Sequence, residues 1–495
     1  MSSNDLHRKT PIMGWASWNR FFTNISEECI KAQMDALVDT GLAEYGYIYC
    51  NTDDGFFGGR GEDGRLMFHK ERFPNGIKVL ADYAHKLGLK AGIYSEAGDN
   101  TCGHYYNGEA ENGKNVGLYG FEERDLNMYL DEFGFDFIKV DWCGGVRLGL
   151  DEYEQYGKIG RIVEDIRKRT GRQLVYNICR WQFPGAWAPD VADSWRTGAD
   201  IAPRFDSVLH QIDNIKPLAK YCGPGHVNDL DMMQIGNGMS LVEDRTHFTM
   251  WCMMSTPLII GCDLTSISAD TLDILKNKEL IAINQDSACL QAFAVKEFRD
   301  ENDALIGEIW VKDLGERNSP KKAVVFLNRS ETAIDMAAEY PELGLGGKIL
   351  SVRDLIAHAD IDSGENISLT VPPHDAAAFV ITAQKAVCVS DINEVPDEVE
   401  CEKAIKISLD EAKRLAAEGA YLVDVRTPAE YAESHLDGAI NVCYTDIHGI
   451  AGWFIPDKER GVIVYCTTGK RSSQAKTSLE HLGYKKIYYL GGVEI

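Results

Sequence analysis

The sequence predicts an α/β protein in which a (β/α)8 barrel is followed by an antiparallel β-sandwich and a small α/β domain. Three observations predict this fold class. Over the first 290 residues, short strand-like runs that end in polar residues alternate with segments of helical periodicity. From about residue 291, short alternating runs are separated by Gly, Asn, Asp and Pro, which is typical of a sandwich. A new alternation of strand and helix begins at about residue 404.

Eight strand-like runs in the first segment are enough to close a barrel. The expected strands are residues 11–18, 45–54, 90–98, 135–143, 173–181, 194–200, 226–232 and 258–264. Amphipathic segments such as 27–39 and 78–87 lie between them, and each ends near a glycine that can cap a helix. We therefore assign residues 1–290 to the barrel.

The rest of the chain divides into three parts. Residues 291–384 contain the expected sandwich strands 304–311, 322–327, 366–371 and 376–381. Residues 385–403 are acidic, carry Pro396 and show weak periodicity, as a linker does. Residues 404–495 form the last domain, with apolar strands at 421–425 and 462–465.

Composition excludes several classes of partner. The 495 residues carry a formal net charge of -25, which repels phosphate backbones and anionic lipids but not a neutral substrate. We therefore expect neither nucleic acid nor a membrane surface as partner. The N-terminus lacks an apolar signal core, and no run of about 18 apolar residues follows, so we expect a cytoplasmic protein or one whose signal was removed.

The cysteines argue against a metal or a disulfide scaffold. Thirteen in 495 residues are too few for such a scaffold, and their spacing contains no CxxC pair or Cys/His zinc pattern. We expect no metal and no cofactor. The sequence leaves the oligomeric state open, a homo-oligomer included.

Chemically useful side chains recur where the expected barrel strands end, which is where barrel enzymes build their active sites. Glycoside hydrolysis needs one carboxylate that attacks the anomeric carbon and one carboxylic acid that assists the leaving oxygen. Asp141 and Asp200 are the best pair. Lys139 lies on the same strand face as Asp141 and is expected to keep it ionised. Repulsion from Asp141 and partial burial are expected to favour protonated Asp200.

The alternative is that each aspartate only caps the helix after its strand. Capping explains neither the adjacent Asp53 and Asp54 nor Lys139. Trp18 and Trp181 could likewise be core aromatics, although sugar sites also use aromatic faces.

Six motifs resemble glycoside hydrolase family 27, the α-galactosidase and α-N-acetylgalactosaminidase family, over residues 11 to about 385. They are MGWASW at 13–18, RFPNG at 72–76, GIY at 92–94, KVD at 139–141, NDLDM at 228–232 and IAINQD at 281–286. The resemblance implies a barrel followed by a sandwich, with Asp141 as nucleophile and Asp200 as acid/base. It implies a sugar pocket formed by Trp18, Asp53, Asp54, Tyr94, Lys139, Cys143, Arg180, Trp181, Arg196 and Asp231. It also implies a disulfide between Cys102 and Cys143, which a reducing cytosol would leave open.

One position departs from the family pattern. Where similar α-galactosidases have Glu after Cys, this sequence has Arg180, and Phe183 follows. Bulky residues there favour a free 2-hydroxyl over an acetamido group, and Arg180 could also reach an unusual aglycone. The expected activity is retaining exo-hydrolysis of terminal α-galactose from a saccharide. The alternatives within the class are α-N-acetylgalactosaminidase and β-L-arabinopyranosidase.

A second motif, CTTGKRS at 466–472, follows an apolar strand and places backbone N–H groups around one sulfur. With LVDVR at 422–426 and HLDGA at 435–439 it resembles a rhodanese domain. The resemblance implies a persulfide on Cys466, Arg471 in its loop, and a sulfur donor or acceptor as partner. Arg471 is five positions after Cys466, too close for a phosphatase loop. Relatives continue into one more helix, so we expect a truncated copy.

Two other interpretations of this segment stay open. Cys466 could be an inert core thiol, as a cysteine after a buried strand often is. Alternatively, the protein could be a sulfurtransferase or persulfide carrier whose barrel only binds sugar.

Overall fold

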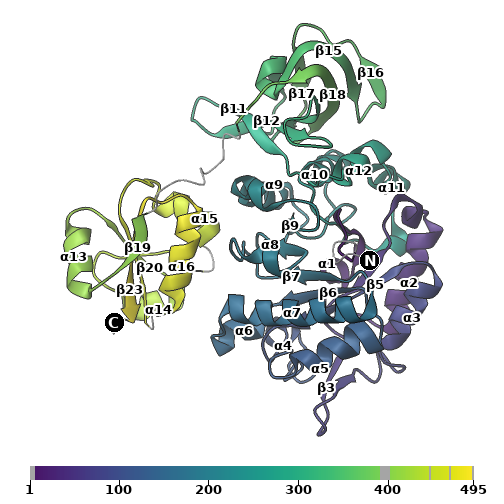
Figure 1. The fold of residues 1–495 in the computed structure, drawn as a ribbon, viewed down its shortest axis with the longest axis vertical. Coiled ribbons are helices and arrows are strands. Elements are labelled where there is room, and N and C mark those ends of the chain that lie inside the picture. The colour runs from purple at the N-terminus through teal and green to yellow at the C-terminus, as the bar shows by residue number, and fades with distance from the viewer. Residues whose placement is uncertain (1–5, 391–401, 445–446, 468–469, 493–495) are drawn as a thin grey trace. The chain divides into compact units, whose positions relative to one another are not determined.

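The computed structural model describes residues 6–390, 402–444, 447–467 and 470–492. Contacts divide the chain into two compact units, residues 1–392 and 393–495, and each is described by itself. The first unit contains a barrel and a sandwich, and the second is a small α/β domain (Figure 1). Among the described residues, none of the helices combines the length and the apolar character needed to cross a membrane.

A curled sheet of eight parallel strands forms the core of the first unit, as predicted (Figure 1). The strands follow the order β10, β1, β2, β5, β6, β7, β8 and β9. A parallel bridge between Met233 and Ile260 links the two edge strands. Their bounds are β1 (Met13–Ala16), β2 (Tyr49–Thr52), β5 (Lys90–Glu96), β6 (Phe137–Asp141), β7 (Val175–Ile178), β8 (Ser194–Arg196), β9 (Val227–Asp229) and β10 (Leu258–Ile260). Each lies inside its predicted range, because the extra residues mostly form loops at the barrel mouth.

The helices around the sheet begin at capping side chains. Ser26 accepts a backbone hydrogen bond at the start of α2 (Glu27–Asp39), and Asp151 does so for α7 (Glu152–Thr170). Ser240 and Glu243 form a capping box at α10 (Leu241–Met253). The others are α1 (Trp18–Phe21), α3 (Lys78–Lys86), α4 (Cys102–Tyr106), α5 (Glu122–Asn127), α6 (Cys143–Leu148), α8 (Ala188–Val191), α9 (Phe205–Ile215), α11 (Ala269–Leu275) and α12 (Lys278–Asn284). The predicted helices 27–39 and 78–87 are α2 and α3, followed by the left-handed glycines Gly41 and Gly88.

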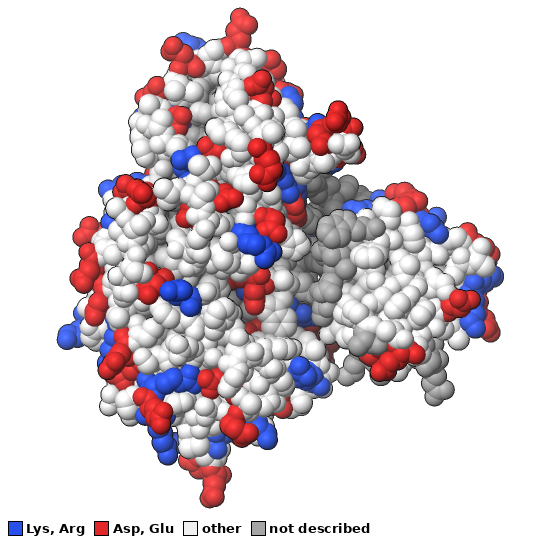
Figure 2. Space-filling view, turned by 180° about the vertical axis from the view of Figure 1, so that it is seen from behind, with Lys and Arg blue, Asp and Glu red and all other residues white. Residues whose placement is uncertain are grey.

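Shorter elements complete the barrel. A hairpin of β3 (Phe57–Arg60) and β4 (Leu66–Phe68) follows β2. The short helical turns are η2 (Leu42–Tyr45), η3 (Met128–Glu132), η4 (Lys216–Tyr221) and η5 (Leu264–Ser266). On the face shown in Figure 2, acidic and basic side chains are interspersed over the barrel and the sandwich.

The sandwich contains a six-stranded antiparallel sheet in the order β11, β12, β13, β18, β15, β16, and a two-stranded sheet of β14 and β17. Its elements are β11 (Phe293–Arg299), β12 (Leu305–Asp313), β13 (Lys321–Asn328), β14 (Ile334–Ala338), η6 (Tyr340–Leu343), β15 (Leu345–Asp354), β16 (Ala359–Ile361), β17 (Ile367–Val371) and β18 (Ala376–Ala386). The four predicted strands correspond to β12, β13, β17 and β18. The prediction missed β11, β14, β15 and β16. In β15, register shifts against β18 interrupt the alternation that marks a strand.

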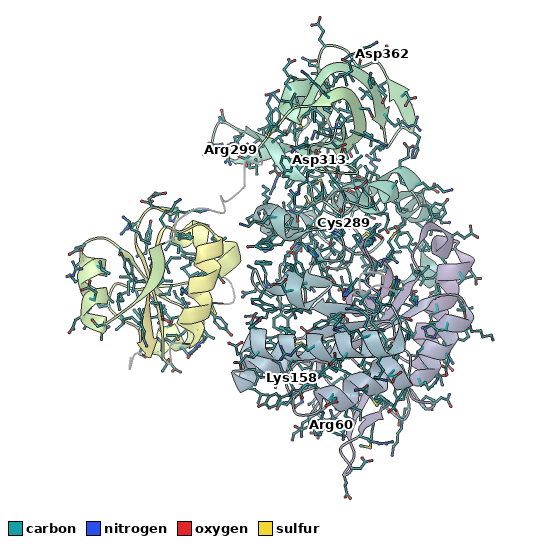
Figure 3. All side chains as sticks on the ribbon, viewed as in Figure 1. Arg60, Lys158, Cys289, Arg299, Asp313 and Asp362 are labelled. Carbon is teal, nitrogen blue, oxygen red and sulfur yellow. A yellow bond between two sulfur atoms is a disulfide. The ribbon has the colours of Figure 1, made fainter. Side chains whose placement is uncertain are left out.

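Buried polar contacts join the sandwich to the barrel. The Lys312 ammonium in β12 donates to the carbonyls of Cys252 and Ile283 at 3.2 and 2.7 Å and to Ser255 Oγ at 2.7 Å. Arg329 contacts both Asp213 in α9 and Glu308 in β12, at 2.6 and 2.7 Å. Figure 3 labels Cys289 and Asp313 on the two sides of this junction. Barrel and sandwich thus form one unit.

The second unit is a parallel five-stranded sheet in the order β19, β23, β22, β20, β21. Its elements are β19 (Glu402–Ile407), α13 (Leu409–Ala417), β20 (Tyr421–Asp424), α14 (Pro428–Glu433), β21 (Ile440–Asn441), α15 (Ile447–Phe454), β22 (Val462–Cys466), α16 (Lys470–His481) and β23 (Lys486–Gly492). Since β18 ends at Ala386 and β19 begins at Glu402, the first and last residues of the predicted linker 385–403 belong to strands. Its residues 391–401 lie outside the described residues.

Candidate active site at the barrel mouth

The C-terminal ends of the barrel strands bring most of the predicted sugar-binding residues together. In the sheet register, Lys139 of β6 pairs with Tyr94 of β5 and with Asn177 of β7, so these three side chains lie at one level. One cavity is lined by the predicted residues Asp53, Tyr94, Lys139, Arg196 and Asp231, together with Asn51, Asn177 and Asp229. The cavity therefore gathers carboxylates, cations and an aromatic ring, as recognition of a polar sugar requires.

Lys139 holds the centre of this cavity. Its Nζ donates to Asp53 Oδ2 at 2.9 Å and lies 6.0 Å from the ring centre of Trp18 and 5.5 Å from that of Tyr94. Burial disfavours the charged amine, but Asp53 and Asp141 outweigh it and raise the pKa of Lys139 well above its usual value. Lys139 is therefore a fixed cation that orients Asp53.

Asp141 ends β6 and is 5% exposed. Its Oδ1 accepts the Trp142 N–H at 3.2 Å, and its Oδ2 lies 3.1 Å from Cys102 Sγ. Burial raises the pKa of Asp141 to about 7, although Lys139 lowers it, and Asp200 and Asp53 raise it further. The expectation that Lys139 keeps Asp141 ionised was incomplete, because Lys139 pairs with Asp53 and the burial outweighs its effect.

Asp200 lies in the loop after β8, and its side chain is 54% exposed. Partial burial of Asp200 was predicted, and this prediction is wrong. Arg196 Nη2 lies 3.1 Å from Asp200 Oδ1 and 2.9 Å from Asp231 Oδ2, so one guanidinium holds both carboxylates. The loop falls outside the regular strand, which is why strand periodicity did not predict its exposure.

Asp54 is buried beside Asp53. Its Oδ2 accepts the Gly103 N–H at 2.7 Å and its Oδ1 the Gly55 N–H at 2.8 Å. Burial raises the pKa of Asp54 to about 6, and the hydrogen bonds from Thr101 and Gly103 lower it. A Cβ at Gly103 would come within 2.6 Å of Asp54 Oδ2, so this close approach requires glycine.

Two predicted residues have unusual backbone conformations. Trp181 has φ +60° and Asp231 has φ +81°, in the left-handed region that non-glycine residues rarely adopt. Asp231 is held there by accepting the Ile201 and Met232 N–H groups at 2.9 and 2.7 Å. Burial raises the pKa of Asp231 to about 6, with Arg196 opposing. Backbone strain of this kind is retained where it positions functional groups.

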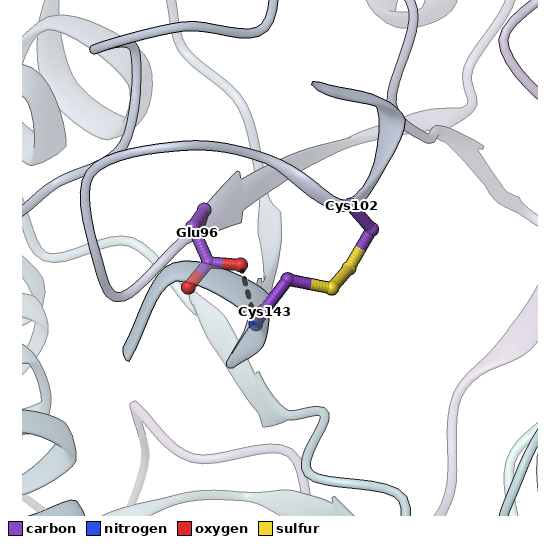
Figure 4. Close-up of side chains that lie close together, drawn as sticks. All are labelled: Glu96, Cys102 and Cys143. Carbon is purple, nitrogen blue, oxygen red and sulfur yellow. Dashed lines mark hydrogen bonds between the residues drawn. A yellow bond between two sulfur atoms is a disulfide. The ribbon is translucent and has the colours of Figure 1, made fainter. Parts of the chain in front are cut away.

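A disulfide joins Cys102 to Cys143 beside Asp141, with the two Cα atoms 5.4 Å apart (Figure 4). Glu96, at the end of β5, accepts the N–H of Cys143 and of Gly98, each at 2.9 Å. Burial and the charge of Asp141 raise the pKa of Glu96 well above its usual value. Because the two sulfurs are bonded to each other, this group is a crosslink that fixes the loops after β5 and β6. Sequence reasoning noted Glu96 at its strand end but did not give it this role.

Arg180 does not line the cavity. Its side chain is 1% exposed, and its Nε donates to Glu152, the first residue of α7, at 2.5 Å. Phe183 packs on Tyr221, with ring centres 4.7 Å apart. The prediction that these bulky side chains exclude a 2-acetamido group therefore has no steric basis here, because both are turned into the protein.

Asn177 and Asp229 were missed. The amide of Asn177 donates to Asp229 Oδ2 and to Ser194 Oγ, each at 2.8 Å, across the floor of the cavity. Both residues lie on barrel strands, Asn177 four positions before Trp181 and Asp229 two positions before Asp231. Their alternation with residues already selected was the signal that could have identified them.

In the second unit, Cys466 ends β22 and is buried. The Ser472 N–H, in the first turn of α16, donates to Cys466 Sγ at 3.4 Å. Arg471 forms two hydrogen bonds with Glu430, at 2.7 and 2.8 Å, which lower the pKa of Glu430 to about 2. The predicted loop residues Thr468 and Gly469 lie outside the described residues. The described part of the loop surrounds a thiol with a helix N-terminus and a fixed cation.

Comparison with known proteins identifies the families of both units. The family described as "Alpha galactosidase A" matches residues 10–286, its C-terminal beta sandwich domain matches 307–381, and the rhodanese-like domain matches 408–494. An alpha-galactosidase of Oryza sativa subsp. japonica is 38% identical over 76% of this chain and 85% of its own. Alpha-galactosidase A of Cellvibrio japonicus is 41% identical over 66% and 78%. The crystal structure of alpha-galactosidase I from Mortierella vinacea aligns with a TM-score of 0.67 at 30% identity, over 77% and 98%. The chain therefore belongs to the α-galactosidase family, glycoside hydrolase family 27, and carries a rhodanese-like domain after its sandwich.

Proposed function

We propose that the protein is a retaining exo-α-galactosidase in which Asp141 is the nucleophile and Asp200 the acid/base. The observation that carries the proposal is the pair of carboxyls beside the cavity: buried Asp141 contacts the disulfide, and Arg196, which lines the cavity, holds Asp200. Asp141 attacks the anomeric carbon while Asp200 donates its proton to the leaving oxygen. Asp200 then removes a proton from a water that attacks the anomeric carbon, the bond between this carbon and Asp141 breaks, and galactose leaves with its configuration retained.

The different surroundings of the two carboxyls suit these roles. Asp200 must exchange protons with the leaving group and with water, and its exposure allows both. Asp141 attacks as an anion, so the ionised form of this buried carboxyl is the reactive one. A bound aglycone would cover Asp200 and place the leaving oxygen beside it.

Galactose is the proposed sugar because Asp53 lines the cavity and adjacent Asp54 is buried next to it, so that their carboxylate oxygens could accept hydrogen bonds from the 4- and 6-hydroxyls. The relatives named above are α-galactosidases, which supports the same choice. α-N-Acetylgalactosaminidase and β-L-arabinopyranosidase remain the alternatives. Rates on nitrophenyl α-galactoside, α-N-acetylgalactosaminide and β-L-arabinopyranoside would rank the three sugars.

The mechanism is tested by trapping the glycosyl-enzyme. A 2-deoxy-2-fluorogalactosyl fluoride should label the peptide that contains Asp141, as seen by mass spectrometry, and Asp141→Ala should abolish both label and turnover. Asp206→Asn, an exposed carboxylate in α9, is the matched control and should react like the unmodified protein. A label on another carboxylate, or full turnover by Asp141→Ala, would disprove the assignment.

A second activity is proposed for the rhodanese-like domain, because the Ser472 N–H is directed at Cys466 Sγ. The Cys466 thiolate would take the outer sulfur of thiosulfate and release sulfite, and then pass that sulfur to an acceptor such as cyanide. Thiocyanate formation should vanish in Cys466→Ser and persist in Cys443→Ser. Absence of thiocyanate from the unmodified protein would count against this activity without affecting the galactosidase.

A further inference from the structure

A group of three aromatic side chains and one arginine lies at the end of α1 and in α4 and α6, close to the disulfide beside Asp141. It consists of Phe22, Tyr105, Tyr106 and Arg147, called the rim cluster below. Tyr106 is 69% exposed and Phe22 49% exposed. Large exposed aromatic rings gathered beside a cavity are typical of a ligand-binding surface.

The helices that carry most of the rim cluster are joined by the Cys102–Cys143 disulfide, which contacts the proposed nucleophile Asp141. Cys102 is the first residue of α4 and Cys143 the first of α6, and the two helices lie side by side. Cys102 Sγ lies 3.1 Å from Asp141 Oδ2. Side chains three and four positions apart share a helix face. Tyr105 and Tyr106 therefore lie on the same face of α4 as Cys102, and Arg147 lies on the same face of α6 as Cys143. Four residues of helix advance about 6 Å, roughly the length of one hexose unit.

The side chains of the rim cluster hold one another in place. The guanidinium carbon of Arg147 lies 4.0 Å from the ring centre of Tyr105 and 5.9 Å from that of Tyr106. Arg147 Nη2 also donates to Tyr106 Oη at 3.3 Å. The Asn100 amide donates to Tyr105 Oη at 3.0 Å. The surface is thus ordered before any ligand arrives, which lowers the entropy lost on binding.

Phe22 connects the rim cluster to the cavity. Its ring packs edge-on against Trp18 at 5.6 Å, and Trp18 lies over Lys139. The hydroxyl of Thr23, next to Phe22, donates to the carbonyl of Asn107, next to Tyr106, at 2.9 Å. Aromatic contacts therefore run from Lys139 through Trp18 to Phe22, and the Thr23–Asn107 hydrogen bond joins the segment that carries Phe22 to the end of α4. Phe22 also has φ +49°, so the fold keeps a large apolar side chain exposed in a strained conformation.

We propose that the rim cluster is the subsite for the first sugar of the aglycone, which makes oligosaccharide α-galactosides the preferred substrates. The proposal rests on the α-galactosidase function proposed above. Tyr106 and Phe22 provide ring faces for the apolar side of a hexose. Arg147 forms no ion pair with any carboxylate of the described residues, and its N–H groups serve as donors to the sugar hydroxyls.

The test compares substrates that share the galactosyl group and differ in the leaving group. α-Galactosyl fluoride has no aglycone ring, whereas melibiose places a hexose on the rim cluster. Tyr106→Ala and Arg147→Ala should each raise KM for melibiose, lowering kcat/KM about tenfold, with less than a twofold change for the fluoride. Tyr106→Phe keeps the ring and should retain most of the melibiose activity.

Leu350→Ala removes an exposed apolar side chain from the sandwich strand β15 and serves as the matched control. Thermal melting would establish that each variant is folded, and Phe22→Ala provides an independent variant. Equal losses on both substrates, or no loss on melibiose, would overturn the subsite while leaving the galactosidase function intact. If the unmodified protein hydrolyses neither substrate, both proposals fail.

Discussion

At the scale of single residues, the charges in the cavity are balanced across strands and not along one strand. Lys139 neutralises Asp53, and this leaves buried Asp141 with a raised pKa. Arg196 neutralises Asp200 and Asp231 together. The reaction therefore depends on which carboxyl is protonated, and this can be measured as a pH profile.

The first prediction concerns the acidic limb of that profile. Protonated Asp141 cannot attack, so kcat/KM for α-galactosyl fluoride should fall as pH drops through about 7, the pKa of Asp141. Asp53→Asn removes a charge that raises this pKa and frees Lys139 for Asp141. The limb should therefore move to lower pH, even though the maximal rate falls. A limb at unchanged pH would contradict this electrostatic account.

The second prediction concerns stability in acid. His247 is fully buried in α10 against Trp251, and burial lowers its pKa from 6.5 to about 3. Between these values the unfolded chain binds a proton that the folded protein does not, so the free energy of unfolding decreases as pH falls below 6.5. At pH 4 the loss from this one group approaches about 3 kcal/mol.

His247→Phe should reduce the difference in unfolding free energy between pH 7 and pH 4, as measured by urea denaturation. The exposed His210 of α9 provides a control, and His210→Phe should leave that difference unchanged. The account of His247 is wrong if both variants follow the pH dependence of the unmodified protein.

At the scale of elements, α4 and α6 are short helices that depend on the Cys102–Cys143 disulfide for their position. The bridge closes a loop with a sequence separation of 41 residues. Crosslinks of this size typically stabilise a fold by about 2–4 kcal/mol. Here the bridge also forms the wall behind Asp141.

The third prediction follows from that position. The double variant Cys102→Ser with Cys143→Ser should lower the melting temperature and lower kcat/KM for α-galactosyl fluoride, because Asp141 loses the sulfur packed against it. A reducing agent should have the same effect on the unmodified protein and none on the double variant. Unchanged activity in the double variant would show that the bridge does not position Asp141.

The fourth prediction concerns the junction of barrel and sandwich. Arg329 lies between buried Glu308 and the α9 residue Asp213, and Lys216 pairs with the same two carboxylates at 2.6 and 2.9 Å. Arg329→Leu therefore removes one of the two cations that hold these carboxylates, and we expect the free energy of unfolding to fall by about 2 kcal/mol in chemical denaturation. Arg299→Leu removes an exposed arginine that pairs with Glu297 in the same sandwich and should leave the free energy of unfolding nearly unchanged. Equal effects of the two variants would contradict a structural role for the junction.

At the scale of the whole molecule, two compact units carry two different chemical sites. The cavity residues all lie in the first unit, and Cys466 with its contacts lies in the second. The whole chain has a formal net charge of -25. On the face in Figure 2, acidic side chains are mixed with basic ones. A neutral saccharide is compatible with such a surface.

The fifth prediction tests the independence of the units. A chain that ends at residue 390 should fold and hydrolyse α-galactosides with kcat/KM within about twofold of the full chain, because its core and cavity are internal to the first unit. It should lose any thiocyanate formation. A large loss of hydrolysis on truncation would show that the second unit contributes to the active site.

The amino-acid sequence alone determined the barrel, the sandwich and the small α/β domain. Parallel strands buried on both faces, followed by polar residues at their ends, are visible as a local pattern. That pattern also selected Asp141, Asp53 and Lys139, whereas Asp231 came only from the family resemblance. It missed β15, whose register shifts hide the alternation, and Asn177, whose polar partner lies on another strand.

Only the tertiary structure decided which charges pair. Lys139 contacts Asp53 from 86 positions away, Arg180 turns to Glu152, and Asp200 is exposed in its loop. Such contacts depend on how curled strands bring distant residues to one level, and on which groups then lose water. Because both are properties of the closed barrel and not of any short segment, sequence periodicity could locate the site residues but not assign their partners or their protonation.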